Sequence, residues 1–186
     1  PAFGGNDWCG NTIAQCGCAM TSVTTMLALF NLVVMPDGTP LDPETVNNWF
    51  NLNATQTARG WVSQGYSYGD VIWTAANQLS GETAKKYPGS KTVKYMGIGT
   101  GSDEEIRTQL KLGNPVVLAV PGHFIAAVGV DGDKILINDP FYRNRTTLDA
   151  YAGKVLSSRL FAPATGLSAV VITFPADTRV QITDKQ

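Results

Sequence analysis

Residues 122–140 read GHFIAAVGVDGDKILINDP, and the fold class can be predicted by starting from these residues. Two runs rich in apolar and β-branched residues flank Asp131-Gly132, a dipeptide that is among the strongest sequence signals for a β-hairpin. If Asp131-Gly132 forms the turn, the register places His123 opposite Pro140 and therefore beside Asp139. The stretch predicts an antiparallel pair of strands that brings a histidine and an aspartate together.

Helices are expected before this hairpin, and further strands around it. Strands are expected at 92–96, 116–120, 123–130, 134–138, about 154–160 and 169–174. Amphipathic spacing predicts helices over 18–30, 43–50, 68–79 and 102–111, with 52–68 as a long loop. Asp42 and Pro43 are expected to open the second helix, and Ser102 with Glu105 forms a capping-box pattern for the last. Helices followed by an antiparallel sheet predict an α+β domain of two layers over residues 1–174, with a polar tail or linker over 175–186.

The composition is that of a globular domain and argues against several functional classes. Hydrophobic residues make up 44% of the 186 residues, charged residues 16%, and the net charge is −1. Without a basic block or interleaved aromatic residues, nucleic acid is not an expected partner. No apolar run approaches the roughly 18 residues needed to span a bilayer. The chain begins at Pro1 rather than at methionine, so we expect a removed leader or a fragment of a longer precursor.

Three cysteines crowd into a short N-terminal stretch, at Cys9, Cys16 and Cys18. An odd count in a secreted protein indicates one bridge and one free thiol. Cys16 and Cys18 are too close to pair without strain, so Cys9–Cys16 is the favoured bridge. Three reduced cysteines in a cytosolic protein are the alternative. Because the chain has a single histidine, a zinc cluster would have few ligands, and no metal is expected.

The residues that can carry chemistry are Cys18, His123 and Asp139. A cysteine in the first turn of a buried helix lies where the helix dipole stabilises a thiolate, and the N–H groups there suit an oxyanion. The thiolate needs a base, and the base needs a third group that fixes its tautomer. Each residue also has a structural interpretation, as a small buried thiol, a core histidine and a turn-opening Asp-Pro. Together they indicate a cysteine hydrolase.

Three segments resemble the bacteriocin-processing (double-glycine) peptidase-like family of papain-fold cysteine peptidases. They are TIAQCGCAMTS at 12–22, GNPVV at 113–117, and GHFIAAVG at 122–129 followed by INDP at 137–140. The similarity in order and spacing extends from about residue 3 to residue 162. It implies a papain-like fold with Cys18 as nucleophile, His123 as base and Asp139 orienting the histidine.

The resemblance leaves the oxyanion donor open. The family's upstream glutamine would precede Pro1, so Asn6, Asn11 and Gln15 are the candidate donors, together with the Cys18 backbone N–H. If none substitutes, the chain is a pseudoenzyme that retains the fold, since one such donor is worth about 10²–10³ in rate.

The resemblance implies hydrolysis of a peptide or protein substrate through a thioester acyl-enzyme, without a cofactor. We also expect a secreted or cell-surface bacterial protein. The best-known relatives cleave after Gly-Gly, but the substrate of this chain is open. Trp61, Tyr66 and Tyr68 either line the cleft or pack in the core. Two other interpretations stay open: an amidase acting on cell-wall peptides, and a catalytically weak or inactive surface protein that assembles into homo-oligomers.

Overall fold

A computed structural model describes residues 12–164 of the chain. Its elements in chain order are α1 (Ile13–Cys16), α2 (Cys18–Leu29), α3 (Pro43–Phe50), β1 (Thr55–Thr57), β2 (Gly60–Val62), β3 (Tyr66–Ser67), β4 (Asp70–Val71), α4 (Ala75–Lys86), β5 (Val93–Gly99), α5 (Asp103–Lys111), β6 (Val116–Val120), β7 (His123–Asp131), β8 (Lys134–Asn138), the 3-10 helix η2 (Leu148–Tyr151) and β9 (Ser157–Pro163). The strand expected at 169–174 and the tail expected at 175–186 lie outside the described residues.

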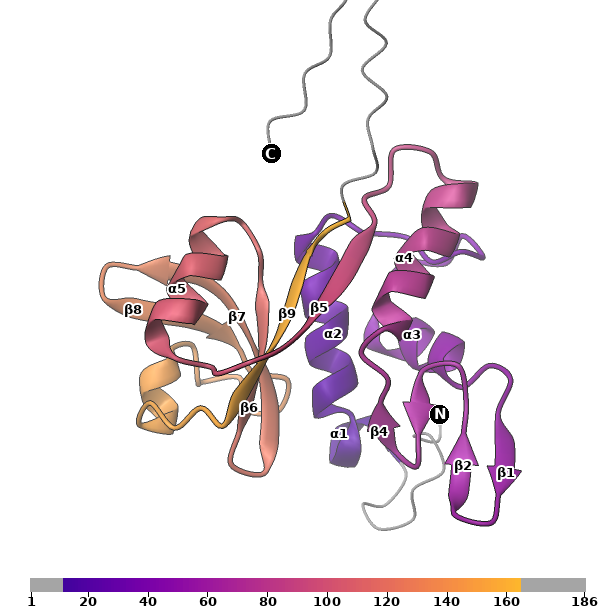
Figure 1. Cartoon of the computed structure of the whole chain (residues 1–186), viewed down its shortest axis with the longest axis horizontal. Coiled ribbons are helices and arrows are strands. Elements are labelled where there is room, and N and C mark those ends of the chain that lie inside the picture. The colour runs from indigo at the N-terminus through magenta and orange to yellow at the C-terminus, as the bar shows by residue number, and fades with distance from the viewer. Residues whose placement is uncertain (1–11, 165–186) are drawn as a thin grey trace, which may run out of the picture.

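The main sheet is antiparallel and has helices on both faces. Its strands run in the order β5-β9-β6-β7-β8. Helices α2, α3 and α4 lie on one side of this sheet and α5 on the other (Figure 1). The α+β class is therefore confirmed, but the expected two layers are three. The reason lies in β6, where all five residues are buried, so that both faces of the sheet need a cover.

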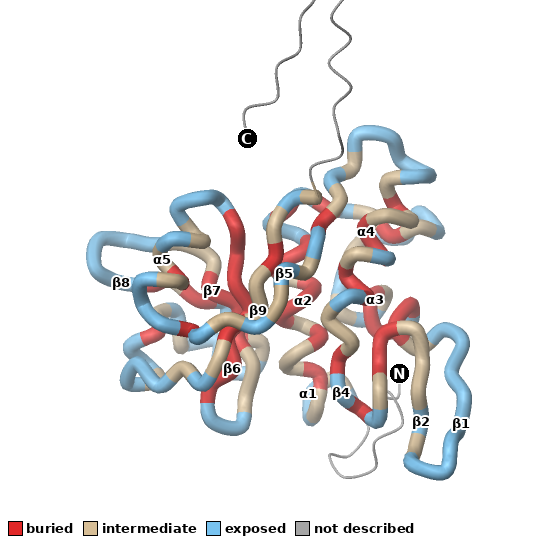
Figure 2. Tube along the Cα trace, viewed as in Figure 1, coloured by how far each residue is buried: buried red, intermediate tan, exposed pale blue. Residues whose placement is uncertain are grey.

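Alternate residues of the central strands supply two hydrophobic cores. Val117 faces the core that contains Met20 and Leu27 of α2, whereas Leu118 and Ile125 face the core that contains Ile106 of α5. Figure 2 shows many of the buried residues along β6, β7 and α2. Side chains that alternate along a strand point to opposite faces, so β6 joins the two cores.

The expected loop over 52–68 is wrong in one respect, because it contains strands. Strands β1 to β4 form a small antiparallel sheet beside α3 and α4 (Figure 1). These strands have only two or three residues, and β1 is exposed throughout, so no alternation of apolar and polar residues announces them. Tyr66 anchors the sheet: its ring is fully buried and its hydroxyl donates to Asn47 Oδ1 at 2.8 Å.

The helix expected over 68–79 is misplaced. Tyr68 and Gly69 have φ angles of 54° and 90°, which no α-helix accepts, and α4 begins only at Ala75. The helix then continues through Gly81 to Lys86. Strand β9 likewise begins at Ser157, not 154, after a left-handed turn at 152–153.

The predicted helix starts agree with the capping interactions. Asp42 accepts from the Thr45 N–H at 2.8 Å and Thr45 Oγ1 accepts from the Asp42 N–H at 3.0 Å, a complete capping box before α3. Ser102 caps α5 by accepting from the Glu105 N–H at 3.2 Å. The Glu105 carboxylate departs from the predicted box, because it accepts from the Gly101 N–H at 2.9 Å.

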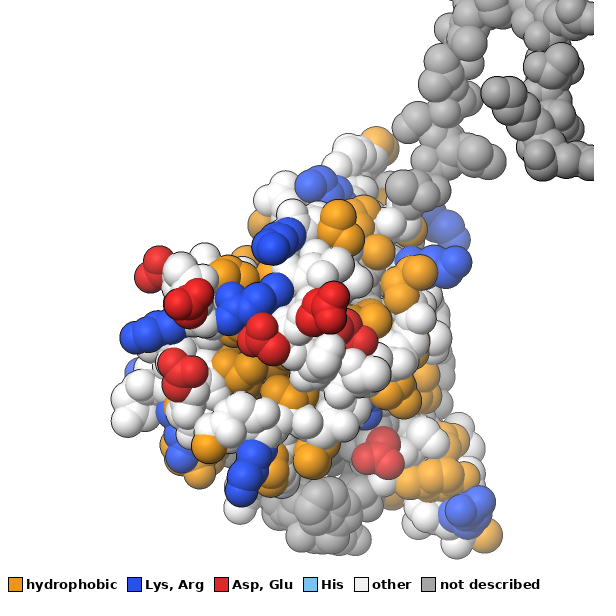
Figure 3. All heavy atoms as spheres, turned by 60° about the vertical axis from the view of Figure 1, so that its left-hand side comes forward, with side chains coloured by type: hydrophobic (Ala, Val, Ile, Leu, Met, Phe, Trp, Pro, Cys, Tyr) orange, Lys and Arg blue, Asp and Glu red, His pale blue; other side chains and the backbone are white. Residues whose placement is uncertain are grey.

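The surface of the sheet side carries mixed charge. On the face that Figure 3 shows, Lys and Arg side chains alternate with Asp and Glu side chains, with apolar side chains between them. That face therefore presents no extended field of one sign.

Gly17, between α1 and α2, is required by close packing and not by its backbone angles. Its φ of −81° suits any residue, but a Cβ there would lie 2.5 Å from the Ile13 carbonyl oxygen and 2.9 Å from Ile13 Cα. We expect Gly17→Ala to lower the free energy of unfolding by about 1–3 kcal/mol, because backbone must move to admit the methyl group. Denaturant unfolding measures this.

The matched control is Gly81→Ala in α4, where an added Cβ meets no atom within 4 Å. Alanine is the better helix former, so this variant should gain about 0.5–1 kcal/mol. Equal stability of the two variants would contradict the close packing of Gly17.

Candidate active site

Cys18 lies at the N-terminal end of α2. Thr12 caps α1 by accepting from the Gln15 N–H, and the Gly17 N–H donates to the Ile13 carbonyl at 2.8 Å. The short α1 thus ends at Cys16, and only Gly17 separates it from Cys18, where α2 begins. Cys18 is a free, half-buried cysteine, as predicted. Cys9 lies outside the described residues, so the Cys9–Cys16 bridge stays a prediction.

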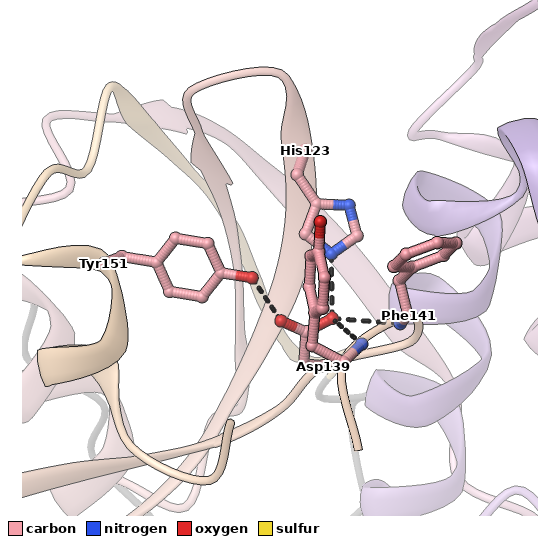
Figure 4. Close-up of polar contacts among 5 residues, drawn as sticks. His123, Asp139, Phe141 and Tyr151 are labelled. Atoms are coloured by element: carbon pink, nitrogen blue, oxygen red, sulfur yellow. Dashed lines mark hydrogen bonds and ion pairs between the residues drawn. The ribbon is translucent and has the colours of Figure 1, made fainter. Parts of the chain in front are cut away.

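His123 begins strand β7 and reaches both other candidate residues. Its Nε2 lies 2.9 Å from Asp139 Oδ1, and the thiol of Cys18 hydrogen-bonds to the same ring. Because Nε2 is occupied by Asp139, Nδ1 is the ring nitrogen left for the thiol (Figure 4). The structure therefore brings together the three residues that the sequence singled out, from the starts of α2 and β7 and from the end of β8.

The hairpin that joins His123 to Asp139 has a different register from the predicted one. Asp131 pairs with Lys134, so the turn is Gly132-Asp133 and not Asp131-Gly132. A bulge between Ala127 and Gly129 then shifts the pairing by one residue. The ladder ends where Ala126 faces Asn138. Asp139 lies just past that end and meets the imidazole diagonally.

Asp139 is a buried carboxylate with a full set of donors. Its side chain has no exposed surface. Oδ1 accepts from the backbone N–H groups of Phe141 and Tyr142, both at 2.9 Å, in addition to His123. Oδ2 accepts from the Tyr151 hydroxyl (Figure 4). Buried charge is tolerated only when it is compensated in this way.

These contacts set the pKa of Asp139 and of Tyr151. Burial alone would raise the pKa of Asp139, but the hydrogen bonds from Tyr151, from two backbone N–H groups and from His123 outweigh it and lower the pKa. Burial and the bond to Asp139 raise the pKa of Tyr151 to about 12. At neutral pH the phenol therefore keeps its proton and acts as donor to an ionised carboxylate.

The same balance favours the charged forms of His123 and Cys18. Burial would lower the pKa of His123, yet its hydrogen bonds and charge interactions with Cys18 and Asp139 raise it. Burial would raise the pKa of Cys18, but the bond to His123 and the backbone N–H groups of Phe124 and Ala19 lower it. Both shifts favour the thiolate form of Cys18 and the imidazolium form of His123.

Sequence reasoning missed the cluster that supports Asp139 from the side away from Cys18. Tyr151 comes from η2, and its hydroxyl also hydrogen-bonds to Arg145. The Arg145 guanidinium lies 3.6 Å from the centre of the Tyr142 ring and 5.0 Å from that of Tyr151. The spacing of these residues from Asp139 in the sequence does not predict the contact, which forms only when η2 folds back onto β8.

Among the residues that the structure describes, two hollows border Cys18 and His123. One, of about 420 Å³, contains Gln15, Pro140 and Phe141 in its wall. Gln15 is exposed and its Oε1 accepts from Thr12 Oγ1 at 2.7 Å. The candidate oxyanion donor Gln15 therefore lies in the cleft, whereas Asn6 and Asn11 lie outside the described residues.

The other hollow, of about 590 Å³, contains Trp73 and Phe124 in its wall. Trp61, Tyr66 and Tyr68 line neither hollow, so the hypothesis that they line the cleft is wrong. Tyr66 packs in the core, and the aromatic residues of this hollow come instead from the β4–α4 connection and from β7.

No metal or membrane-spanning feature accompanies this site in residues 12–164. Within that range no group of three or more His, Cys, Asp or Glu side chains is arranged to hold a metal ion. Nor is any helix there long and apolar enough to cross a membrane.

Comparison with known proteins identifies one family. The model of the Peptidase_C39 like family matches residues 6–157, which include Cys18, His123 and Asp139. No curated protein and no solved structure matches the chain. The family match agrees with the α+β architecture and with the resemblance found in the sequence.

Tyr151→Phe tests the support of Asp139, because it keeps the ring and removes the donor. We expect the free energy of unfolding at pH 7 to fall by about 1–2 kcal/mol, the worth of a hydrogen bond to a charged group in a partly exposed position. The folded pKa of Asp139 is lowered, so its stabilisation is present above the unfolded pKa of about 3.9 and is lost as pH falls through the folded pKa. The deficit of the variant should therefore shrink below about pH 4, as denaturant unfolding across pH will show.

Tyr142→Phe is the matched control, since Tyr142 meets the Asp139 carboxylate through its backbone and not through its hydroxyl. It should change stability by less than about 0.5 kcal/mol. A Tyr151→Phe protein as stable as this control at pH 7 would disprove the role of the phenol.

Proposed function

The chain belongs to the Peptidase_C39 like family, and we propose that it is a cysteine peptidase that works through Cys18, His123 and Asp139. One observation carries the proposal: the imidazole of His123 lies between the Cys18 thiol and the buried Asp139 carboxylate. A nucleophile, a base within hydrogen-bond reach and a group that orients the base are the components of covalent acyl transfer.

In the first half of the reaction, the Cys18 thiolate attacks the carbonyl carbon of a peptide bond and forms a C–S bond. The oxyanion that develops faces the N-terminal end of α2, where the Cys18 N–H and the Gln15 side chain are the candidate donors. The His123 imidazolium gives its proton to the departing amine as the C–N bond breaks. A thioester on Cys18 and a neutral His123 remain.

In the second half, His123 takes a proton from water as the water oxygen attacks the thioester. The C–S bond breaks, the carboxylic acid product leaves, and the thiolate–imidazolium pair is restored. Asp139 keeps Nε2–H of His123 engaged throughout, so that Nδ1 faces the reacting atoms. The chemistry uses only groups of this chain, a peptide and water.

An extracellular location and the Cys9–Cys16 bridge are part of the same proposal. A bridge between the two other cysteines would leave Cys18 as the single free thiol, which protects the nucleophile from pairing in an oxidising compartment. The bridge would also tie the start of the chain to α1, next to the cleft.

The pH dependence of Cys18 alkylation by iodoacetamide tests the proposal without a known substrate. Since the pKa of Cys18 is lowered, labelling should follow a titration well below the usual thiol value of about 8.5. In His123→Ala the hydrogen bond and charge of the imidazole are lost, whereas burial and the N–H groups of Phe124 and Ala19 remain, so the pKa of Cys18 should rise and labelling at pH 7 should fall by about tenfold. Titrations that are alike near pH 8.5 in both proteins would overturn the proposal.

Peptide hydrolysis by Cys18→Ala supplies the second test. The variant should retain no turnover of a casein or peptide-mixture substrate that the wild type cleaves, because no nucleophile remains. Its free energy of unfolding should stay within about 1–2 kcal/mol of wild type, since a half-buried thiol contributes little packing. Turnover that survives in Cys18→Ala would move the chemistry to another residue.

A further inference from the structure

We propose that the hollow of about 590 Å³ beside Cys18 selects substrates with a bulky apolar side chain, aromatic above all, next to the scissile bond. This inference rests on the proposed function and names its substrate class. We call the hollow the aromatic pocket, and define it by Val71, Trp73, Val120, Phe124, Leu156 and Arg159. Cys18 and His123 also line it, so a side chain bound there belongs to a residue close to the bond that is cut.

Two aromatic rings form the wall of the aromatic pocket. The ring centres of Trp73 and Phe124 lie 5.4 Å apart with an angle of 52° between the planes, a favourable tilted contact. Both side chains are partly exposed, unlike the fully buried aromatic residues of the core. They come from the β4–α4 connection and from β7, so the pocket joins the small sheet to the main sheet.

Arg159 gives the same wall a positive charge. Its guanidinium carbon lies 5.1 Å from the centre of the Trp73 ring and 5.7 Å from that of Phe124. Nη1 donates to Ser157 Oγ at 2.9 Å and to the Ser158 carbonyl at 3.0 Å. No carboxylate within residues 12–164 forms an ion pair with this guanidinium, and its buried Nε has no acceptor there.

A third aromatic ring suits this wall better than a cation or a small side chain. A ring that enters the pocket can stack on Trp73 or Phe124 and lie against the guanidinium, a cation–π arrangement. A lysine side chain would meet the unpaired positive charge of Arg159, with only the exposed Asp70 nearby to compensate. Charge therefore reinforces the preference for apolar side chains.

The size of the pocket argues against a substrate whose cleavage site is made only of glycines. A volume of about 590 Å³ falls in the range of roughly 300–1,000 Å³ that is usual for sites that enclose a ligand. Glycine has no side chain to fill it. Burial of a phenylalanine side chain in an apolar site favours binding by about tenfold to a hundredfold over glycine.

Peptidyl acyloxymethyl ketones, which alkylate a reactive cysteine after binding as substrates, test the inference on the full chain. Three acetylated probes carry Gly-Gly, Phe-Gly or Gly-Phe next to the reactive ketone, and intact mass gives the rate of labelling. We expect at least one phenylalanine probe to label Cys18 about tenfold faster than the Gly-Gly probe. Iodoacetamide, which has no side chain to place, measures the reactivity of the thiol in parallel.

Two substitutions locate the preference in the aromatic pocket. Trp73→Ala removes one ring, and Leu156→Asp places a carboxylate on a side chain that is 65% exposed at the edge of the pocket. Both should lower the rate with the preferred phenylalanine probe about fivefold more than the rate with Gly-Gly. Leu112→Asp, on a residue that is 68% exposed and outside the pocket, is the control and should keep the full preference.

The outcomes separate this inference from the proposed function. Iodoacetamide labelling can show a lowered pKa of Cys18 while the Gly-Gly probe labels as fast as the phenylalanine probes. In that case the pocket inference is wrong, and the proposed peptidase function is not contradicted. A phenylalanine preference that survives unchanged in Leu156→Asp and Trp73→Ala also overturns it. A Cys18 that reacts with neither iodoacetamide nor any probe overturns the proposed function and this inference together.

Discussion

Helix α2 packs against strand β7, and the position of the candidate active site follows from this contact. Cys18 begins the helix and His123 begins the strand, so the contact between the two elements brings the thiol to the imidazole. Close packing of the buried side chains of α2 holds both elements in place, because neither can slide without opening the core. Hydrophobic packing of the two elements, and not the polar contacts among Cys18, His123 and Asp139, therefore positions the candidate site.

A second requirement is the compensation of buried charge around Asp139. Its carboxylate has no exposed surface, yet four donors keep its pKa low and therefore keep it ionised. An ionised Asp139 raises the pKa of His123, and a protonated His123 lowers that of Cys18. Tyr151 helps to keep Asp139 ionised, Asp139 raises the pKa of His123, and the protonated His123 in turn lowers the pKa of the nucleophile Cys18.

The sequence predicted the elements that carry the site better than it predicted their contacts. Strands β6 and β8 have the expected bounds, because continuous apolar runs between turn residues are a strong local signal. The predicted hairpin register was wrong, because the turn lies at Gly132-Asp133 and a bulge between Ala127 and Gly129 then shifts the pairing by one residue. Tyr151 and the walls of the aromatic pocket could not be predicted either, because segments distant in the chain meet there only in the folded molecule.

An NMR titration of the His123 imidazole tests for the thiolate–imidazolium pair. His123 is the only histidine of the chain, so its resonance needs no assignment. We expect a pKa above the ordinary value of about 6.5 in the wild type and a lower pKa in Cys18→Ala, where the thiolate partner is gone. A pKa at or below about 6.5 that stays the same in Cys18→Ala would contradict a thiolate–imidazolium pair at this site.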